Sequence, residues 1–196
     1  DEYCEEFLCI PFPVDLGLVG YRVFLTHEGL QEEISQVTTL EQLQEYLIGQ
    51  GLKWLDVPIL EHNGFRVYEV SSYESLFQMV AEGRLDLFPR GVNEIHNEWG
   101  RFGHLEGLAL EESLMLFYPL PRFFITYKGN EELAQRVLAG LEAAYEDGSI
   151  LALWKDLHGR HLDLEDLASR RLFVLENPYI RTLDPSYQQY FLNPME

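Results

Sequence analysis

Arg90 and Glu94 are the residues whose types and spacing most clearly suggest a binding site. They follow the run Leu-Asp-Leu-Phe at 85–88 and Pro89, which together predict a buried strand that ends at the proline. A guanidinium and a carboxylate just beyond such a strand commonly face a ligand crevice, where they could bind the charged groups of a small solute. The alternative is a structural ion pair between Arg90 and either Glu94 or Glu98.

A strand, a helix and a second strand are predicted to position these two residues. Residues 67–70 alternate like a short strand, and a helix begins after two serines and ends at Gly83, before the run 85–88. This order is typical of a βαβ unit. Since residues 21–90 continue the alternation, the sequence predicts an α/β fold. The apolar periodicity of residues 163–173 predicts one more amphipathic helix.

A glycine-containing loop at residues 49–56 is a second candidate binding element. It follows a predicted helix at residues 40–47, which Gly49 would end, and it precedes another helical stripe. Free N–H groups at a helix amino terminus suit a carboxylate or another small anion. Trp54 could form an aromatic wall of the site. The alternative is a plain turn with Trp54 in the core.

The charge composition excludes several classes of partner. Fourteen basic residues against 33 acidic ones give a formal net charge of −19, which would repel phosphate backbones and anionic lipids. We therefore expect no nucleic-acid partner. No apolar run approaches the roughly 18 residues needed to span a bilayer, so we expect no membrane insertion. Because the charges are scattered, a solvated acidic surface is the simplest interpretation.

We expect the two cysteines, Cys4 and Cys9, to be free or buried thiols. In an extended segment, residues five apart point to opposite faces, so a disulfide between them would need an intervening turn. A redox or metal role is disfavoured because no CxxC motif is present. The chain starts at Asp1 without an initiator methionine or a signal sequence, so we expect a mature or trimmed product.

No local motif declares a catalytic or metal site. On a helix, Glu94 and Glu98 would share a face while His96 points away, so this run is a poor metal-binding pattern. No phosphate-binding loop, HExxH motif or nucleophile–base arrangement is recognisable, and we expect no cofactor. Carboxylates are numerous enough that a pair could act as acid and base, which leaves a hydrolase as a minor hypothesis.

Three stretches, taken in order over residues 18–158, resemble bacterial extracellular solute-binding proteins, close to the polar amino-acid-binding family of ABC transporters. They are TLEQLQ leading to GQGLKW, then FRVYEVSSYESLFQMVAEGRLDLFPRGVNEI, and finally YPLPRFFITYKGNEELAQRVLAGLEAAYEDGSILALWKD. The resemblance implies a type II periplasmic binding fold, in which crossing strands join two lobes that close on a ligand. It also implies a periplasmic location and an ABC permease or a sensor protein as partner.

The same resemblance divides the chain into three parts. Residues 1–21 correspond to the end of lobe one and the first hinge crossing, 22–127 to lobe two, and 128–196 to C-terminal helices returning to lobe one. Family members normally carry roughly eighty further residues before the first crossing strand, so lobe one is expected to be incomplete. The arginine that usually grips the ligand carboxylate has no counterpart near residues 2–3. We therefore expect either a fragment or a variant that has lost amino-acid binding.

Candidate ligand-binding residues follow from this correspondence. The loop at 50–54 would meet the ligand carboxylate through Gln50, Lys53 and Trp54, and Arg90 and Glu94 fall near the carboxylate that receives the amino group. Tyr21 and Arg22 flank the expected hinge.

The expected function is capture of a small polar solute, such as an amino acid, for transport or sensing. An interaction or sensory module that keeps the fold without the ligand is the first alternative, and a carboxylate-based hydrolase is the second. An incomplete sheet edge would also permit a dimer.

Overall fold

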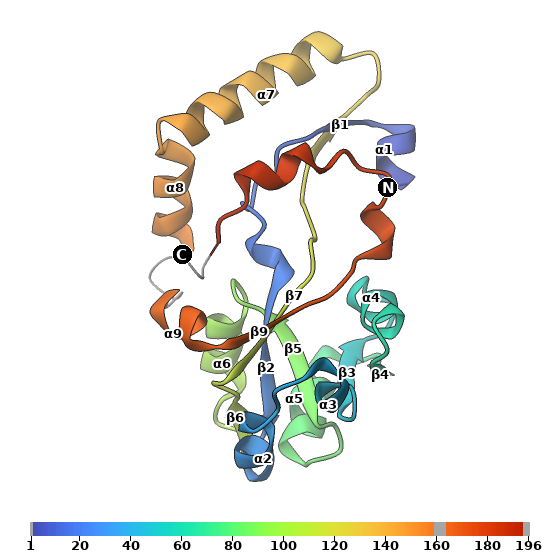
Figure 1. Cartoon of the computed structure of the whole chain (residues 1–196), viewed down its shortest axis with the longest axis vertical. Helices are drawn as coiled ribbons and strands as arrows, with labels where there is room; N and C mark the ends of the chain where they lie inside the picture. The colour runs from blue at the N-terminus through green and yellow to red at the C-terminus, as the bar shows by residue number, and fades with distance from the viewer. Residues whose placement is uncertain (1, 159–163, 194–196) are drawn as a thin grey trace.

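In the lower half of the view in Figure 1, the computed structural model, which describes residues 2–158 and 164–193, contains a mixed seven-stranded sheet. Its strands, in chain order, are β2 (Tyr21–His27), β3 (Leu47–Gly51), β4 (Arg66–Val70), β5 (Leu87–Gly91), β6 (Leu108–Leu110), β7 (Leu114–Phe117) and β9 (Arg171–Val174). Their order across the sheet is β4-β3-β5-β2-β7-β9, and β6 pairs with the end of β2.

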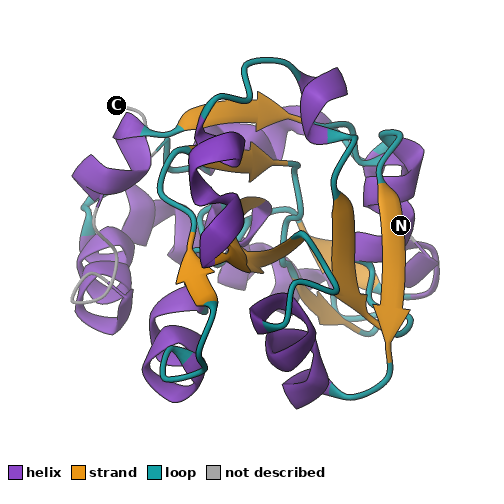
Figure 2. Ribbon diagram, turned by 90° about the horizontal axis from the view of Figure 1, so that it is seen from below, coloured by secondary structure: helices purple, strands orange, loops and turns teal. Residues whose placement is uncertain are grey.

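The helices pack around the strands on more than one side (Figure 2). They are α1 (Glu2–Glu6), α2 (Gln31–Ser35), α3 (Leu40–Leu43), α4 (Asp56–His62), α5 (Tyr73–Ala81), α6 (Ile95–Phe102), α7 (Glu131–Glu146), α8 (Ser149–His158) and α9 (Leu164–Ser169). Short 3-10 turns are η1 (Leu18–Gly20), η2 (Glu28–Leu30), η3 (Pro178–Ile180) and η4 (Pro185–Tyr190). None of the helices described is long and apolar enough to cross a membrane.

The predicted βαβ unit is confirmed. Strands β4 and β5 both run parallel to β3, and α5 connects them. Strand β2 runs antiparallel to both β5 and β7, so it is the central strand on which the two halves of the sheet meet. Arg22 of β2 lies opposite Gly91 of β5, which brings the predicted hinge residue next to the predicted ligand-binding segment.

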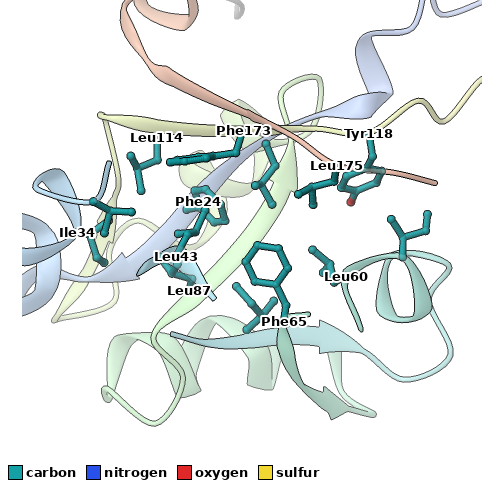
Figure 3. Close-up of a cluster of buried hydrophobic side chains, with 14 residues drawn as sticks. Phe24, Ile34, Leu43, Leu60, Phe65, Leu87, Leu114, Tyr118, Phe173 and Leu175 are labelled. Carbon is teal, nitrogen blue, oxygen red and sulfur yellow. The ribbon is translucent and has the colours of Figure 1, made fainter. Parts of the chain in front are cut away.

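Both faces of strand β2 are buried, and apolar residues occupy four of its seven positions. Phe24 belongs to the core in Figure 3, which also contains Leu43 and Leu87, whereas the adjacent Leu25 packs with Phe77 in a separate core. Successive side chains of a strand point to opposite faces, so these two cores lie on opposite sides of the sheet.

A second, two-stranded sheet lies away from the first. Strands β1 (Leu8–Ile10) and β8 (Phe124–Thr126) pair antiparallel, and α7 packs next to β1. In Figure 1, α7 lies at one end of the molecule and α2 at the other. The chain therefore reaches from the central sheet to a smaller second unit of structure through the segments that precede β2 and follow β7.

The predicted strand ending at Pro89 is wrong in its extent, because β5 continues through Pro89 and Arg90 to Gly91. The strand begins after Asp86, whose carboxylate accepts a hydrogen bond from the Leu47 backbone N–H at 2.7 Å. Strand β5 pairs with β3 only at Leu87. Pro89 lies beyond this pair, so its lack of an N–H group removes no hydrogen bond from the pairing with β3.

The predicted helix at 40–47 and the glycine loop after it are also wrong in part. Helix α3 ends at Leu43, and Gly49, Gln50 and Gly51 lie within β3. A Cβ at Gly49 would approach the Leu85 side chain to 2.5 Å, so this glycine permits close packing and does not end a helix.

The predicted helix at 163–173 gives way to a strand. Helix α9 ends at Ser169, and residues 171–174 form β9, which pairs in parallel with β7. Residue 163 lies outside the described residues. Pairing with an exposed strand edge overrides the local helical pattern here, since it satisfies the backbone groups of β7.

The expectation of free cysteines is wrong. Helix α1 turns the chain back before β1, so the Cα atoms of Cys4 and Cys9 lie 5.3 Å apart and the residues form a disulfide. Cys4 lies within α1 and Cys9 within β1, so the segment that joins them is not extended and the two side chains can meet.

Removing this disulfide will cost a small but measurable amount of stability. A loop closed over five residues of sequence separation predicts about 2 kcal/mol from chain entropy. For a chain of this size the double variant Cys4→Ser/Cys9→Ser should therefore melt about 4–8 °C lower by calorimetry. Treating the variant with a reductant is the control and should change nothing, whereas equal midpoints for the oxidised wild type and the variant would contradict the prediction.

Candidate functional site

A cleft of about 400 Å³ lies beside the start of β2 and contains several of the predicted binding residues. It is lined by Val19, Arg22, Trp54, Leu55, Asp56, Arg90, Glu94, Leu120, Pro121 and Arg122. These residues come from η1, β2, the start of α4, the end of β5, the turn before α6 and the segment between β7 and β8. The fold thus gathers segments that are more than one hundred residues apart in sequence.

The buried guanidinium of Arg22 organises one wall of this cleft. Its Nε donates to Asp56 Oδ1 at 3.0 Å and to the Tyr118 hydroxyl at 2.9 Å, and its Nη2 lies 2.9 Å from the same Asp56 oxygen. Nη1 donates to the Val19 carbonyl, and the Tyr118 hydroxyl donates to Asp56. One side chain therefore ties η1, α4 and the end of β7 to the central strand.

The ionisation of these groups follows from their pairing. Burial alone would raise the pKa of Asp56, but the Arg22 charge and the Tyr118 hydroxyl hold it below the ordinary value. Burial, reinforced by the Asp56 carboxylate, raises the pKa of the Tyr118 hydroxyl despite the opposing charge of Arg22. At neutral pH the group therefore consists of a cation, an anion and a neutral phenol.

A second buried guanidinium, that of Arg90, organises the opposite wall. Its Nε donates to both carboxylate oxygens of Glu98 at 2.9 and 2.8 Å, and its Nη2 lies 3.1 Å from Glu94 Oε2. The Tyr73 hydroxyl donates to Glu98 at 2.6 Å. The Trp54 ring lies beneath the guanidinium, with 4.9 Å between the Arg90 Cζ and the ring centroid.

This arrangement realises the ion pair that the sequence offered as the alternative for Arg90. Burial opposes the charged form of Arg90, but Glu98 and then Glu94 raise its pKa above the ordinary value, so it stays protonated. Burial also raises the pKa of the Tyr73 hydroxyl, with a further contribution from Glu98. Any role of Arg90 in ligand contact would therefore be shared with an internal structural role.

Glu94 is the partly open carboxylate of the cleft. Its side chain is 41% exposed, whereas that of Glu98 is buried beneath Arg90. Next to it, the buried Oδ1 of Asn93 has no hydrogen-bond partner among the described residues. A Cβ at Gly91 would lie 2.7 Å from Asn93 Oδ1, 3.0 Å from Glu94 Oε2 and 3.1 Å from Arg22 Nη1. Polar atoms therefore converge around a backbone position that has no side chain.

Three predicted site residues lie outside this cleft. Gln50 is fully buried in β3, and its amide atoms have no hydrogen-bond partner among the described residues. Lys53 is exposed, has a positive φ of 64° and donates its backbone N–H to Glu69. Tyr21 is buried against Phe117, with ring centroids 4.4 Å apart. The structure therefore brings together the other four predicted residues, Arg22, Trp54, Arg90 and Glu94.

Sequence reasoning missed Asp56, Tyr118 and Arg122. Asp56 is the first residue of α4, where an acid is common for purely helical reasons, so nothing local marks it as a partner of Arg22. Tyr118 and Arg122 follow the end of β7. The rule that polar residues beyond a strand end face a crevice could have found both.

Among the described residues, no group of three or more histidine, cysteine, aspartate or glutamate side chains is arranged to hold a metal ion. In the cleft, Arg22 instead pairs with Asp56, and Arg90 pairs with Glu94 and with the deeper Glu98.

Removing the Arg22 side chain will strongly destabilise the fold. Arg22→Met leaves the buried Asp56 carboxylate without its cation, and breaking such a pair costs about 3–5 kcal/mol. Urea unfolding at pH 7 measures this loss. The matched control is Arg84→Met, because Arg84 pairs with Glu82 on the surface and should change stability by less than about 0.5 kcal/mol. Equal effects of the two variants would refute the structural role of Arg22.

The Asp56 carboxylate will contribute to the pH dependence of stability. Its folded-state pKa lies below the ordinary value of 3.8, so the native state binds fewer protons than the unfolded state as the pH falls through this range. Its stabilisation is complete above about pH 4 and is lost at lower pH. The difference in unfolding free energy between wild type and Asp56→Asn should therefore shrink below about pH 4.

Urea titrations between pH 7 and pH 3 test this dependence. Glu61→Gln, which removes an exposed carboxylate from the same helix, controls for the loss of one negative charge. A wild-type advantage over Asp56→Asn that stays constant down to pH 3 would count against the pairing.

Comparison with known proteins gives similarity at the level of structure. No protein-family model matches the chain, and no curated protein matches it in sequence. A structural-genomics target from Bacillus subtilis superposes with a TM-score of 0.55 at 16% identity, covering 90% of this chain and 68% of the other. A binding component of an ABC transporter from Wolinella succinogenes, complexed with lysine, gives 0.56 at 16% identity, covering 78% and 63%.

An ancestral arginine-binding protein bound to arginine gives a TM-score of 0.54 at 17% identity, covering 80% of this chain and 66% of the other. The chain thus spans about two thirds of the length of these structures. Partial coverage agrees with the expected incomplete first lobe. The chain therefore has the type II periplasmic binding protein fold.

Proposed function

We propose that this chain belongs to a solute-binding protein that captures a small solute bearing a charged amino group, such as an amino acid. The supporting observation is the partly open Glu94 carboxylate, which lines the charged cleft. A carboxylate carries a negative charge and two acceptor oxygens, so it can accept hydrogen bonds from a cationic group in the cleft. An ammonium group supplies three donors and a positive charge, which suits the Glu94 carboxylate.

The cleft also offers a cation for the opposite end of such a ligand. Arg122 lines it with a side chain that is 60% exposed, and its Nε lies 3.9 Å from Asp15 Oδ2. Arg22 and Arg90 are buried and paired with carboxylates, so Arg122 is the more accessible of the three guanidinium groups. A ligand carboxylate can therefore pair with Arg122 in place of the anchor arginine that the sequence lacks near residues 2–3.

The similar structures support this class of ligand. The binding component from Wolinella succinogenes is complexed with lysine, and the ancestral arginine-binding protein is bound to arginine. At identities of 16% and 17%, the likeness to these proteins concerns the fold alone. The ligand is our proposal from the charges of the cleft.

We further propose a cellular location for the protein and an assignment of its chain segments to the two lobes. A disulfide such as Cys4–Cys9 persists in oxidising compartments, which supports a periplasmic location. As part of the same proposal, the protein delivers its solute to an ABC permease or a sensor protein. In this proposal residues 1–21 form the end of lobe one and the first hinge crossing, and residues 22–127 form lobe two. Residues 128–196 are the C-terminal helices that return to lobe one. A dimer through the exposed edge of the small sheet is compatible with the same function.

The alternative of a ligand-free module is favoured by one observation. The charges of Arg22 and Arg90 are already compensated by Asp56 and Glu98, so neither guanidinium needs a ligand. A carboxylate-based hydrolase has less support, because a general acid needs a raised pKa, whereas the pKa of Asp56 is lowered. The absence of any ligand effect on the chain would favour the ligand-free module.

The proposal predicts that Glu94→Gln weakens amino-acid binding at least tenfold, since a charge-assisted hydrogen bond is worth about 1.5–3 kcal/mol. Isothermal titration of the 196-residue chain with a panel of amino acids, organic acids and polyamines identifies the ligand and measures this loss. Glu74→Gln is the matched control, because Glu74 pairs with Arg101 on the surface away from the cleft.

Two results would contradict the proposal. One is a panel in which no compound with an amino group binds or raises the melting temperature. The other is a ligand whose affinity is the same for Glu94→Gln, Glu74→Gln and wild type.

A further inference from the structure

A second cavity, of about 320 Å³, adjoins the charged cleft. Leu55, Leu120 and Pro121 line both spaces, so the two meet along these apolar residues. In Figure 1, α1 and α4 lie on the same side of the molecule, and the C-terminal segment with η3 passes between them. The second cavity is bordered by these same regions, since its lining residues include the Cys4–Cys9 disulfide and residues of β8 and η3.

The chemistry of the second cavity differs sharply from that of the first. Its further lining includes Phe123, Ile125, Ile180 and Leu183, and no charged side chain among the described residues contributes to it. The polar side chain of Asn177 is held by the backbone, since it donates to the Pro119 carbonyl at 2.8 Å and accepts from the Tyr179 N–H at 2.9 Å. The cavity therefore presents mainly hydrocarbon and sulfur to an occupant.

Several of these apolar side chains are open to water without an occupant. Ile125 is 47% exposed and Leu55 is 48% exposed, although both belong to cavity walls. Small-molecule sites are typically lined by apolar side chains with a few polar groups that fix the orientation of the ligand. The charged cleft and the apolar cavity together have this composition.

We propose that the ligand is amphipathic, an amino acid whose large apolar side chain occupies the second cavity while its charged groups occupy the first. This inference rests on the proposed function, because it assigns the amino and carboxylate groups to Glu94 and Arg122. It adds the class of side chain. A lysine or arginine side chain in the same orientation would place its charge against hydrocarbon, which is unfavourable without a paired partner.

A homologous series of ligands tests this assignment. Each methylene group transferred from water into an apolar site improves affinity about fourfold. The dissociation constants of L-alanine, L-norvaline, L-norleucine and L-2-aminooctanoate for the 196-residue chain should therefore fall about fourfold per methylene until the cavity is filled. L-lysine and L-arginine should bind more weakly than L-norleucine.

Two adjacent residues of β8 provide a matched pair of variants. Ile125 lines the cavity, whereas Phe124, which is 51% exposed and so similarly accessible, does not. Ile125→Ser should reduce the gain in affinity per methylene, and Phe124→Ser should leave it unchanged. Circular dichroism and thermal unfolding of both variants establish that each is folded.

The outcomes separate this inference from the proposed function. Binding of short and long ligands with equal affinity, or the same slope in Ile125→Ser as in wild type, would overturn the apolar assignment while leaving amino-acid capture intact. If no amino acid binds at all, the proposed function fails and the inference fails with it.

Discussion

The buried guanidinium of Arg22 is the interaction on which the rest of the site depends. A charge removed from water needs partners close at hand, and here Asp56, Tyr118 and the Val19 carbonyl surround it. These partners come from three different segments, so satisfying one cation fixes the start of α4 and the end of β7 against the central strand. The shape of the cleft follows, because the lining residue Leu55 directly precedes Asp56 and the lining residue Leu120 lies two positions after Tyr118.

Arg90, on the neighbouring strand, is a second buried guanidinium paired with carboxylates, but one of its two partners is partly exposed. Its carboxylate partner Glu98 is buried, but Glu94, one helical turn earlier, keeps part of its side chain in the cleft. Internal pairing therefore neutralises the deep charges and leaves Glu94 and Arg122 as the accessible ones. Deep charges shape the walls, and accessible charges are available to a solute, which is the division that a binding site needs.

Local sequence pattern was sufficient for the elements whose contacts are local. The apolar stripe of α5 and the βαβ order follow from periodicity, and the placement of Arg90 and Glu94 near the end of β5 follows from strand and turn signals. The resemblance of three ordered stretches also predicted the fold that the structural comparisons show. Four of the seven predicted site residues lie in one cleft because they cluster near the ends of neighbouring strands, namely Arg22, Trp54, Arg90 and Glu94.

Tertiary structure decided what depends on residues distant in sequence. The extension of β5 through Pro89 requires β2 beside it, and the strand β9 exists because β7 offers a parallel partner. The partnership of Arg22 with Asp56 and Tyr118 spans 34 and 96 residues, so no local periodicity encodes it. Sequence by itself determined the βαβ order and the acidic character of the chain, because composition and periodicity are local properties. Only the tertiary structure decided which charges are paired and which remain open, because pairing depends on proximity in space.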